Sequence, residues 1–327
     1  MTKPAPRGLV HGLAWTASVA VVAWLLAQVV PLFGAPVLAI LIGLAVSAVH
    51  RPPREAAAGI AFSSSVLLQL AIVLLGTGLA LGQVVRIGAR SLPVMLGTLA
   101  VALVGAVVLG KLLAVSERLR TLIGVGTGIC GASAIAAVSG IVRATETEIA
   151  YAISTIFVFN LVAVLVFPPI GRLLHLSQHG FGLWAGTAVN DTSSVVAAAY
   201  AFGHDAGAQA VVVKLTRTTL IIPIAVGLSL LQSRKGGVRT GRLVPLFLIG
   251  FVLASALNTA GLIGAGAHRP LSDAALALIT VALAGVGLNA DIGRMRTTGA
   301  RPLALGALLW VSVACTSLLL QWATGQL

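Results

Sequence analysis

The longest uncharged segment of the chain runs from Leu9 to His50. These 42 residues contain no Lys, Arg, Asp or Glu. A helix needs about 20 apolar residues to cross the hydrocarbon core of a bilayer, so this run has room for two crossings. A soluble domain usually carries charge on about a quarter of its residues. The run therefore predicts an integral membrane protein.

The composition of the whole chain agrees with this prediction. Of 327 residues, 58% are hydrophobic and 9% are charged, and the mean hydropathy is +1.05. The net charge of +13 would suggest a nucleic-acid partner in a soluble protein. Here the cations lie mainly in short loops, so they are better explained by membrane orientation, and we expect no nucleic-acid partner. Cys130 and Cys315 lie in apolar segments without disulfide or metal-ligand spacing. We expect no metal, no cofactor and no enzymatic activity.

Apolar segments recur along the entire sequence, without a linker or a soluble domain. We interpret residues 1–327 as a single polytopic domain of the all-α integral membrane class, with about 10–11 transmembrane segments. The first segment is expected to be an uncleaved span, because a second apolar run follows almost at once. The predicted segments are 12–30, 33–49, 59–82, 92–114, 121–141, 148–168, 181–202, 208–231, 244–264, 271–290 and 302–323.

Loop charges predict the orientation. With a cytoplasmic N-terminus and an external C-terminus, fifteen Lys and Arg residues fall in the inside loops. Four fall outside, and the excess of inside cations favours this orientation. The four outside cations are Arg86, Arg90, Arg143 and Arg269.

Two internal similarities predict inverted repeats, which are common in secondary transporters. Residues 76–79 (GTGL) precede Gly88-Ala89-Arg90, as residues 285–288 (GVGL) precede Gly299-Ala300-Arg301. Residues 126–133 (GTGICGAS) also resemble residues 186–193 (GTAVNDTS) without a gap. These latter segments could be broken spans or re-entrant hairpins. Hairpins would exchange Arg143 and Arg172 between the two faces and leave the charge count unchanged, so loop charge does not decide between the two arrangements. Chance similarity between helices rich in small residues is a further explanation for the resemblance of the two segments.

Three ionisable residues lie well inside predicted spans: Asp191, Lys214 and Arg217. Each charge near the bilayer centre costs ~2.5–3.5 kcal/mol, so they must pair or line a wet cavity. A span that began after Arg217 would be too short, which argues against cations at a helix end. A structural salt bridge to Asp191 is the main alternative. Two cations and one carboxylate leave a net charge of +1, which favours an anionic substrate.

The segment around Asp191 is polar. Thr187, Asn190, Thr192, Ser193 and Ser194 add hydroxyl or amide groups. In a continuous helix, Thr187, Asp191 and Ser194 would share one face. Contacts between helices are the alternative explanation for any one of these groups. Asp191, with Asn190, could also bind a coupling proton or sodium ion.

Gly126, Gly128 and Gly131 interrupt the other repeated segment. Glycine weakens a helix, and the amides at the start of the next half-helix would attract an anion. We therefore include Gly128, Cys130, Gly131 and Ser133 in the candidate site. A packing face of small residues is an equally good explanation, and Cys130 is interpreted as a packed side chain rather than a reactive thiol.

Three strings resemble the YeiH family of bacterial membrane proteins, whose members are labelled sulfate exporters. They are residues 122–134, residues 181–195 and residues 213–218. The resemblance covers most of the chain. It implies a protein of the bacterial inner (plasma) membrane, related to cation/proton antiporters and bile-acid symporters, with inverted repeats and crossed, unwound helices. It brings no established binding residues.

The favoured hypothesis is a secondary transporter that exports sulfate, sulfite or an organosulfonate by alternating access. Lys214, Arg217 and the amides of residues 128–133 would hold the anion, together with Thr187, Asn190, Ser193 and Ser194. Asp191, with Asn190, would bind the coupling proton or sodium ion. A cation/proton antiporter that uses Asp191 is the first alternative, and a passive channel or a scaffold is the second. A homodimer is plausible by analogy with related folds.

Overall fold

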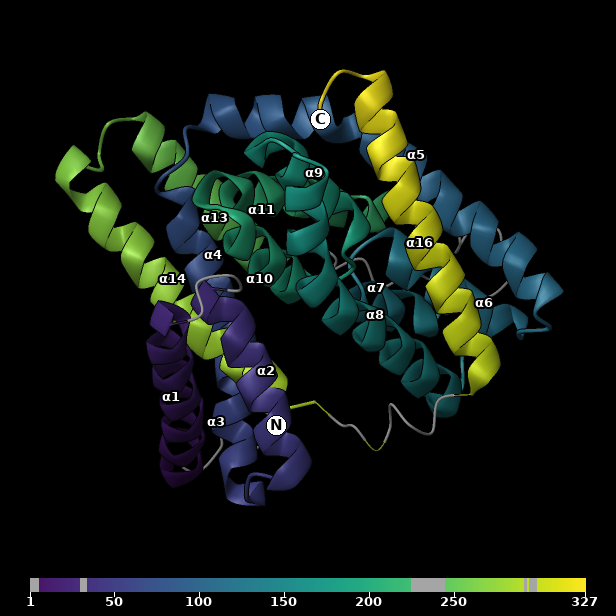
Figure 1. Ribbon diagram of the computed structural model, residues 1–327, viewed down its shortest axis with the longest axis horizontal. Helices are drawn as coiled ribbons and strands as arrows, with labels where there is room; N and C mark the ends of the chain where they lie inside the picture. The colour runs from purple at the N-terminus through teal and green to yellow at the C-terminus, as the bar shows by residue number, and fades with distance from the viewer. Residues whose placement is uncertain (1–5, 30–33, 225–244, 291–292, 294–298) are drawn as a thin grey trace. The chain divides into compact units, whose positions relative to one another are not determined.

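The computed structural model describes residues 6–29, 34–224, 245–290, 293 and 299–327. Regular structure within these residues is helical (Figure 1). Six of the described helices are long and apolar enough to cross a membrane, and three shorter ones are also apolar. This confirms the prediction of an all-α integral membrane protein. The number of crossings and the orientation stay predictions, and residues 225–244, which carry several of the counted cations, lie outside the described residues.

Within the described residues, each predicted segment corresponds to one helix or to a succession of short helices, and residues 225–231 of the predicted segment 208–231 lie outside them. The main difference is α5 (Leu81–Leu112), which begins before the predicted start at residue 92 and contains Pro93. Arg86 and Arg90 lower the hydropathy of its first turns, and both are exposed. A helix needs only its backbone hydrogen bonds to continue, so it runs through charged turns that a hydropathy pattern excludes.

The helices pack in two compact units. Both units consist of apolar helices. The division therefore does not test the prediction that residues 1–327 form a single membrane domain. The first unit contains α1 (Pro6–Val29), α2 (Gly34–Val49), η1 (Arg54–Ala56), α3 (Ala57–Phe62), η2 (Ser63–Leu67), α4 (Leu68–Gly76), α13 (Leu246–Thr259), α14 (Ala265–Leu288) and the end of α10 (Thr192–Phe202). The second contains most of α5, then α6 (Glu117–Gly128), α7 (Ala132–Ser139), α8 (Glu146–Leu173), α9 (Gln178–Ala188), the start of α10, α11 (His204–Thr219) from Asp205 onward, and α16 (Ala300–Ala323).

Glycine lets the helices of the first unit touch backbone to backbone. A β-carbon on Gly12 of α1 would lie 2.5 Å from the Cα of Gly59 in α3. A β-carbon on Gly287 of α14 would lie 3.0 Å from the Cα of Gly43 in α2. Lipid gives apolar helices little reason to associate through the hydrophobic effect, so such close packing is a main source of their association.

Two pairs of short helices in the second unit fold back on themselves. Ser116, which precedes α6, donates from Oγ to Oε1 of Glu148 in the first turn of α8 over 2.8 Å. Placed end to end, α6 and α7 would extend for about 30 Å. The six residues between α7 and α8 can span only about 20 Å. The α6–α7 pair is therefore a hairpin.

The α9–α10 pair is a hairpin by the same reasoning. Gln178, the first residue of α9, accepts a hydrogen bond at Oε1 from the backbone N–H of Ala206 in α11, at 3.0 Å. A straight rod of α9 and α10 would separate these residues by about 30 Å. Only Gly203 lies between α10 and α11, so the chain must return between Gln178 and Ala206.

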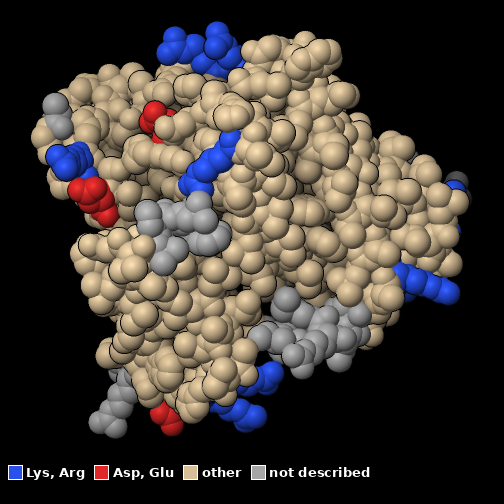
Figure 2. All heavy atoms as spheres, viewed as in Figure 1, with Lys and Arg blue, Asp and Glu red and all other residues tan. Residues whose placement is uncertain are grey.

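The surface is largely uncharged. Figure 2 shows one face of the molecule, where Lys, Arg, Asp and Glu side chains form a few small groups on a broad uncharged area. Exposed apolar side chains include Trp24, Leu25, Val104, Val311 and Leu319. Each belongs to one of the six long apolar helices. Such a surface suits lipid as the surrounding solvent.

Candidate functional site

The two hairpins break at equivalent positions of the repeated sequence. In the gap-free alignment of residues 126–133 with residues 186–193, Gly128 corresponds to Ala188, and Ala132 to Thr192. Helices α6 and α9 end at the first pair, and α7 and α10 begin at the second. The similarity in sequence is thus accompanied by equal helix breaks. An inverted orientation of the two copies remains a prediction.

The breaks lie against each other. Gly131, the residue before α7, has φ of 69° and ψ of −131°. This backbone conformation is essentially restricted to glycine. A β-carbon at this position would lie 3.2 Å from the β-carbon of Asp191, the residue before α10. Glycine is therefore required here both by the backbone and by the closeness of the second hairpin.

Lys214 of α11 binds both breaks. Its side chain is completely buried. The Nζ atom donates to the carbonyl oxygen of Ile129 in the first break and to that of Val189 in the second, each at 2.9 Å. One ammonium group therefore holds the two hairpin tips together.

Arg217 lies one turn further along α11 and is also completely buried. Its Nε donates to the carbonyl of Gly128 at 2.7 Å, and its Nη2 to the carbonyl of Thr127 at 3.0 Å. Its Nη1 donates to the carbonyl of Thr187. The guanidinium group thus binds the last turn of α6 and the last turn of α9.

These contacts explain how two cations are tolerated in completely buried positions. The last carbonyl groups of a helix have no partner within the helix, and the helix dipole places partial negative charge there. Lys214 and Arg217 satisfy such carbonyls at the ends of α6 and α9. Among these three described residues, no ion pair joins either cation to Asp191, so the salt bridge considered from the sequence is not formed.

Asp191 caps α10 and is only half buried. Its Oδ1 accepts from Ser193 Oγ at 2.6 Å and from the Ser194 backbone N–H at 2.7 Å. Its Oδ2 accepts from Ser194 Oγ at 3.1 Å and from Nδ2 of Asn160. Two donors to each oxygen are what an ionised carboxylate requires, because it has about four acceptor positions and no proton to donate.

Asn160, in the middle of α8, was not singled out from the sequence. Its side chain is 2% exposed. While Nδ2 donates to Asp191, Oδ1 accepts from the backbone N–H of Asn190 at 3.0 Å. The side chain thus fixes both the carboxylate and the unwound backbone before it. A lone amide within the apolar run of residues 156–165 was the signal that could have identified it.

One prediction about the polar segment is wrong. Thr187 was expected to share a helical face with Asp191 and Ser194, but α9 ends at Ala188 and the helix does not continue. The Thr187 hydroxyl instead shares a hydrogen bond of 2.7 Å with Oγ of Ser317 in α16. Gln321 of α16 donates to the same Ser317 at 3.1 Å. The hydroxyl of Thr187 therefore joins α9 to α16.

We call the place where the two helix breaks meet, at residues 129–131 and 189–191, the crossing. The other predicted residues lie around it, and their side chains differ in exposure. Ser133, in the first turn of α7, is exposed. Cys130 is 6% exposed and packs in an apolar cluster. Asn190 is 1% exposed, and among the described residues neither its side-chain oxygen nor its nitrogen has a hydrogen-bond partner. A buried amide without partners is costly, which marks this position as one where a solute, an ion or water would be stabilised.

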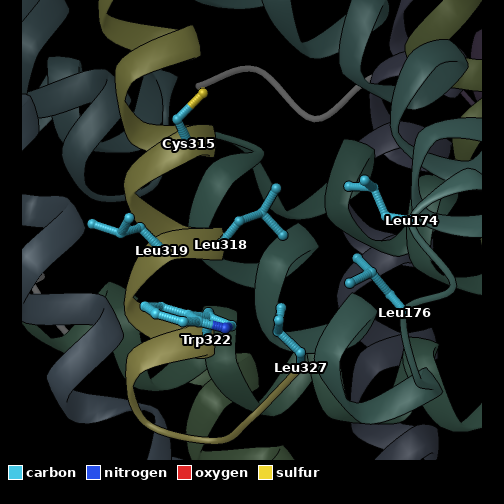
Figure 3. A pocket seen from close by; sticks show the side chains of 7 residues that line it. All are labelled: Leu174, Leu176, Cys315, Leu318, Leu319, Trp322 and Leu327. Carbon is cyan, nitrogen blue, oxygen red and sulfur yellow. The ribbon is translucent and has the colours of Figure 1, made fainter.

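A separate groove lies away from these residues. It has a volume of about 420 Å³ and its lining contains none of the predicted site residues. Figure 3 shows Leu174 and Leu176, which follow α8, across from Leu318 and Trp322 of α16, with Leu327 at one end. The apolar lining offers no group that would bind a polar solute. The groove shows that the loop after α8 lies beside the C-terminal end of α16.

The fold and the crossing define a multi-pass helical membrane protein in which two helix breaks meet around buried polar and charged side chains. A family model described as "Conserved hypothetical protein 698" matches residues 11–306. The chain belongs to this family, that of the UPF0324 membrane proteins, and the resemblance to the YeiH family is thereby confirmed.

Curated relatives match over nearly their whole length. A UPF0324 membrane protein of Streptococcus agalactiae is 41% identical over 327 residues, which covers 97% of this chain and 98% of the relative. One from Streptococcus pneumoniae is 42% identical over 318 residues, with 94% and 95% covered. Another from Streptococcus mutans is 41% identical over 331 residues, with 96% and 97% covered. These names identify membrane proteins and state no substrate.

Proposed function

We propose that the protein is a secondary transporter that moves a small oxyanion across the bacterial inner membrane. The observation that carries this proposal is the start of α7. Gly131 provides no side-chain cap there, and Ala132 and Ser133 are exposed. The first N–H groups of a helix have no partner within the helix, and together with the helix dipole they favour an anion.

The second copy of the motif indicates what such an anion would replace. Asp191 caps α10 with its own carboxylate, whereas its counterpart before α7 is Gly131, which has no side chain. Ser193 donates to the Asp191 carboxylate, and its counterpart Ser133 is exposed. An oxyanion at the start of α7 would take the position that a carboxylate already occupies at the start of α10.

The charges of the crossing favour a negative solute. Lys214 and Arg217 contribute +2 and Asp191 contributes −1, which leaves +1. Both cations are completely buried, so their field is screened much less than at a surface. Two carbonyl oxygens accept from Lys214, and an ammonium group has three N–H donors. Lys214 therefore keeps a donor for a solute, and sulfate, sulfite or an organosulfonate would suit the site.

We assign the other roles in the transport cycle to residues of the same crossing. Asn190 and Asp191 are the groups we assign to a coupling proton or sodium ion, with export as the direction. Gly128, Cys130, Gly131 and Ser194 would shape the site through their backbone and small side chains. Alternating access needs no enzymatic step, and a homodimer would be compatible with it.

Counterflow of radiolabelled sulfate and sulfite in proteoliposomes tests the proposal. Ser133→Ala should raise the KM for the anion about tenfold, because it removes one hydrogen bond to a charged group. Lys214→Ala should abolish counterflow, whereas Lys111→Ala, a matched change at an exposed lysine, should leave it unchanged. If purified protein shows no counterflow of these anions, or if Ser133→Ala and Lys111→Ala behave alike, the anion site is wrong. Flux without counterflow would indicate a passive channel.

A cation/proton antiporter is a second candidate, favoured by one observation. Asn190 presents a side-chain oxygen without a partner among the described residues, directly beside the carboxylate of Asp191. Oxygen ligands of this kind would suit sodium. In the present conformation, however, four donors already occupy the Asp191 oxygens. Sodium-driven proton movement without any anion would support this candidate over the first.

A further inference from the structure

We propose that α6–α7 and α9–α10 are re-entrant hairpins that enter the bilayer from opposite faces, each closing one of two routes to the crossing. The placement of the hairpins is independent of any transported solute. The gating role rests on the proposed transport function. The two parts are therefore tested separately.

Helix α8 separates the bases of the two hairpins. It has 28 residues and is therefore about 42 Å long, more than the ~30 Å hydrocarbon core. The first hairpin begins beside the N-terminal end of α8, where Ser116 binds Glu148. The second begins at Gln178, just beyond the C-terminal end of α8 at Leu173. If α8 crosses the membrane, the two bases lie at opposite faces.

Contacts at the second base agree with this placement. Gln178 of α9 binds Ala206 of α11, so the second hairpin begins and ends at one face. A β-carbon on Gly180 would lie 2.6 Å from the carbonyl carbon of Leu327, the last residue. The loop after α8 therefore shares a face with the C-terminus. Eleven simple spans would place them on opposite faces, whereas hairpins place them together and leave the count of loop charges unchanged.

The tips share the same two cations, which links their movements. Withdrawing the first tip removes the carbonyl of Ile129 from Lys214, and withdrawing the second removes that of Val189. The hydrogen bonds of Arg217 are shared between the hairpins in the same way, because it donates to the carbonyl of Gly128 in the first and to that of Thr187 in the second. If one tip moves, the other still provides acceptors for both cations. If both move together, two buried cations lose these acceptors. Simultaneous opening is thus strongly disfavoured, which is what alternating access requires.

Thiol labelling tests the placement. Single cysteines would be introduced by Arg118→Cys, Thr147→Cys and His179→Cys at exposed positions, and an impermeant maleimide would be applied to right-side-out and inverted vesicles. The parent chain, with Cys130 and Cys315, gives the background. Cysteines at 118 and 147 should react from one face and that at 179 from the other. Reaction at 118 and 147 from opposite faces would overturn the hairpin placement.

A reversible cross-link tests the gating. The double variant Ser116→Cys/Glu148→Cys would tie the base of the first hairpin to α8. Joined by a short thiol-reactive cross-linker that dithiothreitol cleaves, the two cysteines should lower anion counterflow at least tenfold, and dithiothreitol should restore it, while the treated parent keeps its rate. Full counterflow with the cross-link formed would disprove gating by this hairpin. Absence of counterflow in the parent would instead reject the proposed function and leave the labelling result standing.

Discussion

Gly131 and Asp191 occupy the same position in two copies of one motif, and they touch. A β-carbon on Gly131 would lie 3.2 Å from that of Asp191. One copy thus supplies a carboxylate to the helix that follows it, and the other leaves the next helix without one. This asymmetry between similar halves is the basis for the anion site proposed at the start of α7.

Gly131→Ala should destabilise the protein. Its φ of 69° is rarely adopted by residues with a side chain, which costs about 1–3 kcal/mol. The melting temperature, followed by circular dichroism in detergent, should fall by at least about 3 °C. Gly140→Ala is the matched control, since Gly140 has φ of −67° and a β-carbon there would meet nothing within 4 Å. Equal melting temperatures for the two variants would refute the constraint at Gly131.

Asn160→Ala should destabilise the crossing. It leaves Oδ2 of Asp191 with one donor fewer and the N–H of Asn190 without its acceptor. Loss of buried partners of this kind costs about 1–3 kcal/mol each. Asn160→Asp should also fail to restore stability, because it places a second carboxylate beside the first. Asn258→Ala, at a partly exposed position of α13, is the control. A melting temperature for Asn160→Ala as high as that of the control would show that the contact is dispensable.

Arg217→Lys should be poorly tolerated although it keeps the charge. Arg217 reaches three carbonyl groups with a planar fork of donors, and a lysine cannot reproduce this geometry. We expect a fall in melting temperature of about 5 °C or more. Arg118→Lys, at an exposed arginine, should change it by less than about 1 °C. Similar values for both variants would mean that charge alone is needed at position 217.

Thr187→Val and Ser193→Ala should have different effects. The Thr187 hydroxyl binds Ser317, so its loss should lower the melting temperature and leave the KM for the anion within about twofold. Ser193 donates to Asp191, so its loss should change the KM or the dependence on the coupling ion. Counterflow kinetics and melting curves of both variants check this. If Thr187→Val changed the KM for the anion more than Ser193→Ala does, the hydroxyl of Thr187 would belong to the binding site.

Hydropathy alone was sufficient to predict the class of fold. Within the described residues, the predicted segments coincide with helical structure, because lipid leaves the backbone few alternatives to a helix. The gap-free similarity of residues 126–133 and 186–193 also pointed to the two helix breaks. The sequence could not decide between broken spans and hairpins, because hairpins would exchange Arg143 and Arg172 between the two faces and leave the charge balance unchanged. The proposed hairpin placement rests instead on contacts such as that between Ser116 and Glu148.

The residues of the candidate site were singled out from the sequence, but their contacts were not. Asp191, Lys214 and Arg217 do lie near the helix breaks, since buried charge has few tolerable environments. The partners of the cations are backbone carbonyls, which every residue possesses and no sequence pattern reveals. Thr187 was misplaced because its spacing was counted along a helix that ends at Ala188.

The carbonyl partners of Lys214 and Arg217 have a consequence for biosynthesis. A chain is made from its N-terminus, so residues 127–129 and 187–189 precede both cations out of the ribosome. Acceptors from both hairpins are therefore already present when α11 enters the membrane. Swapping the order of these segments, as in a circular permutant that begins with α11, would insert two charges into lipid before anything could neutralise them.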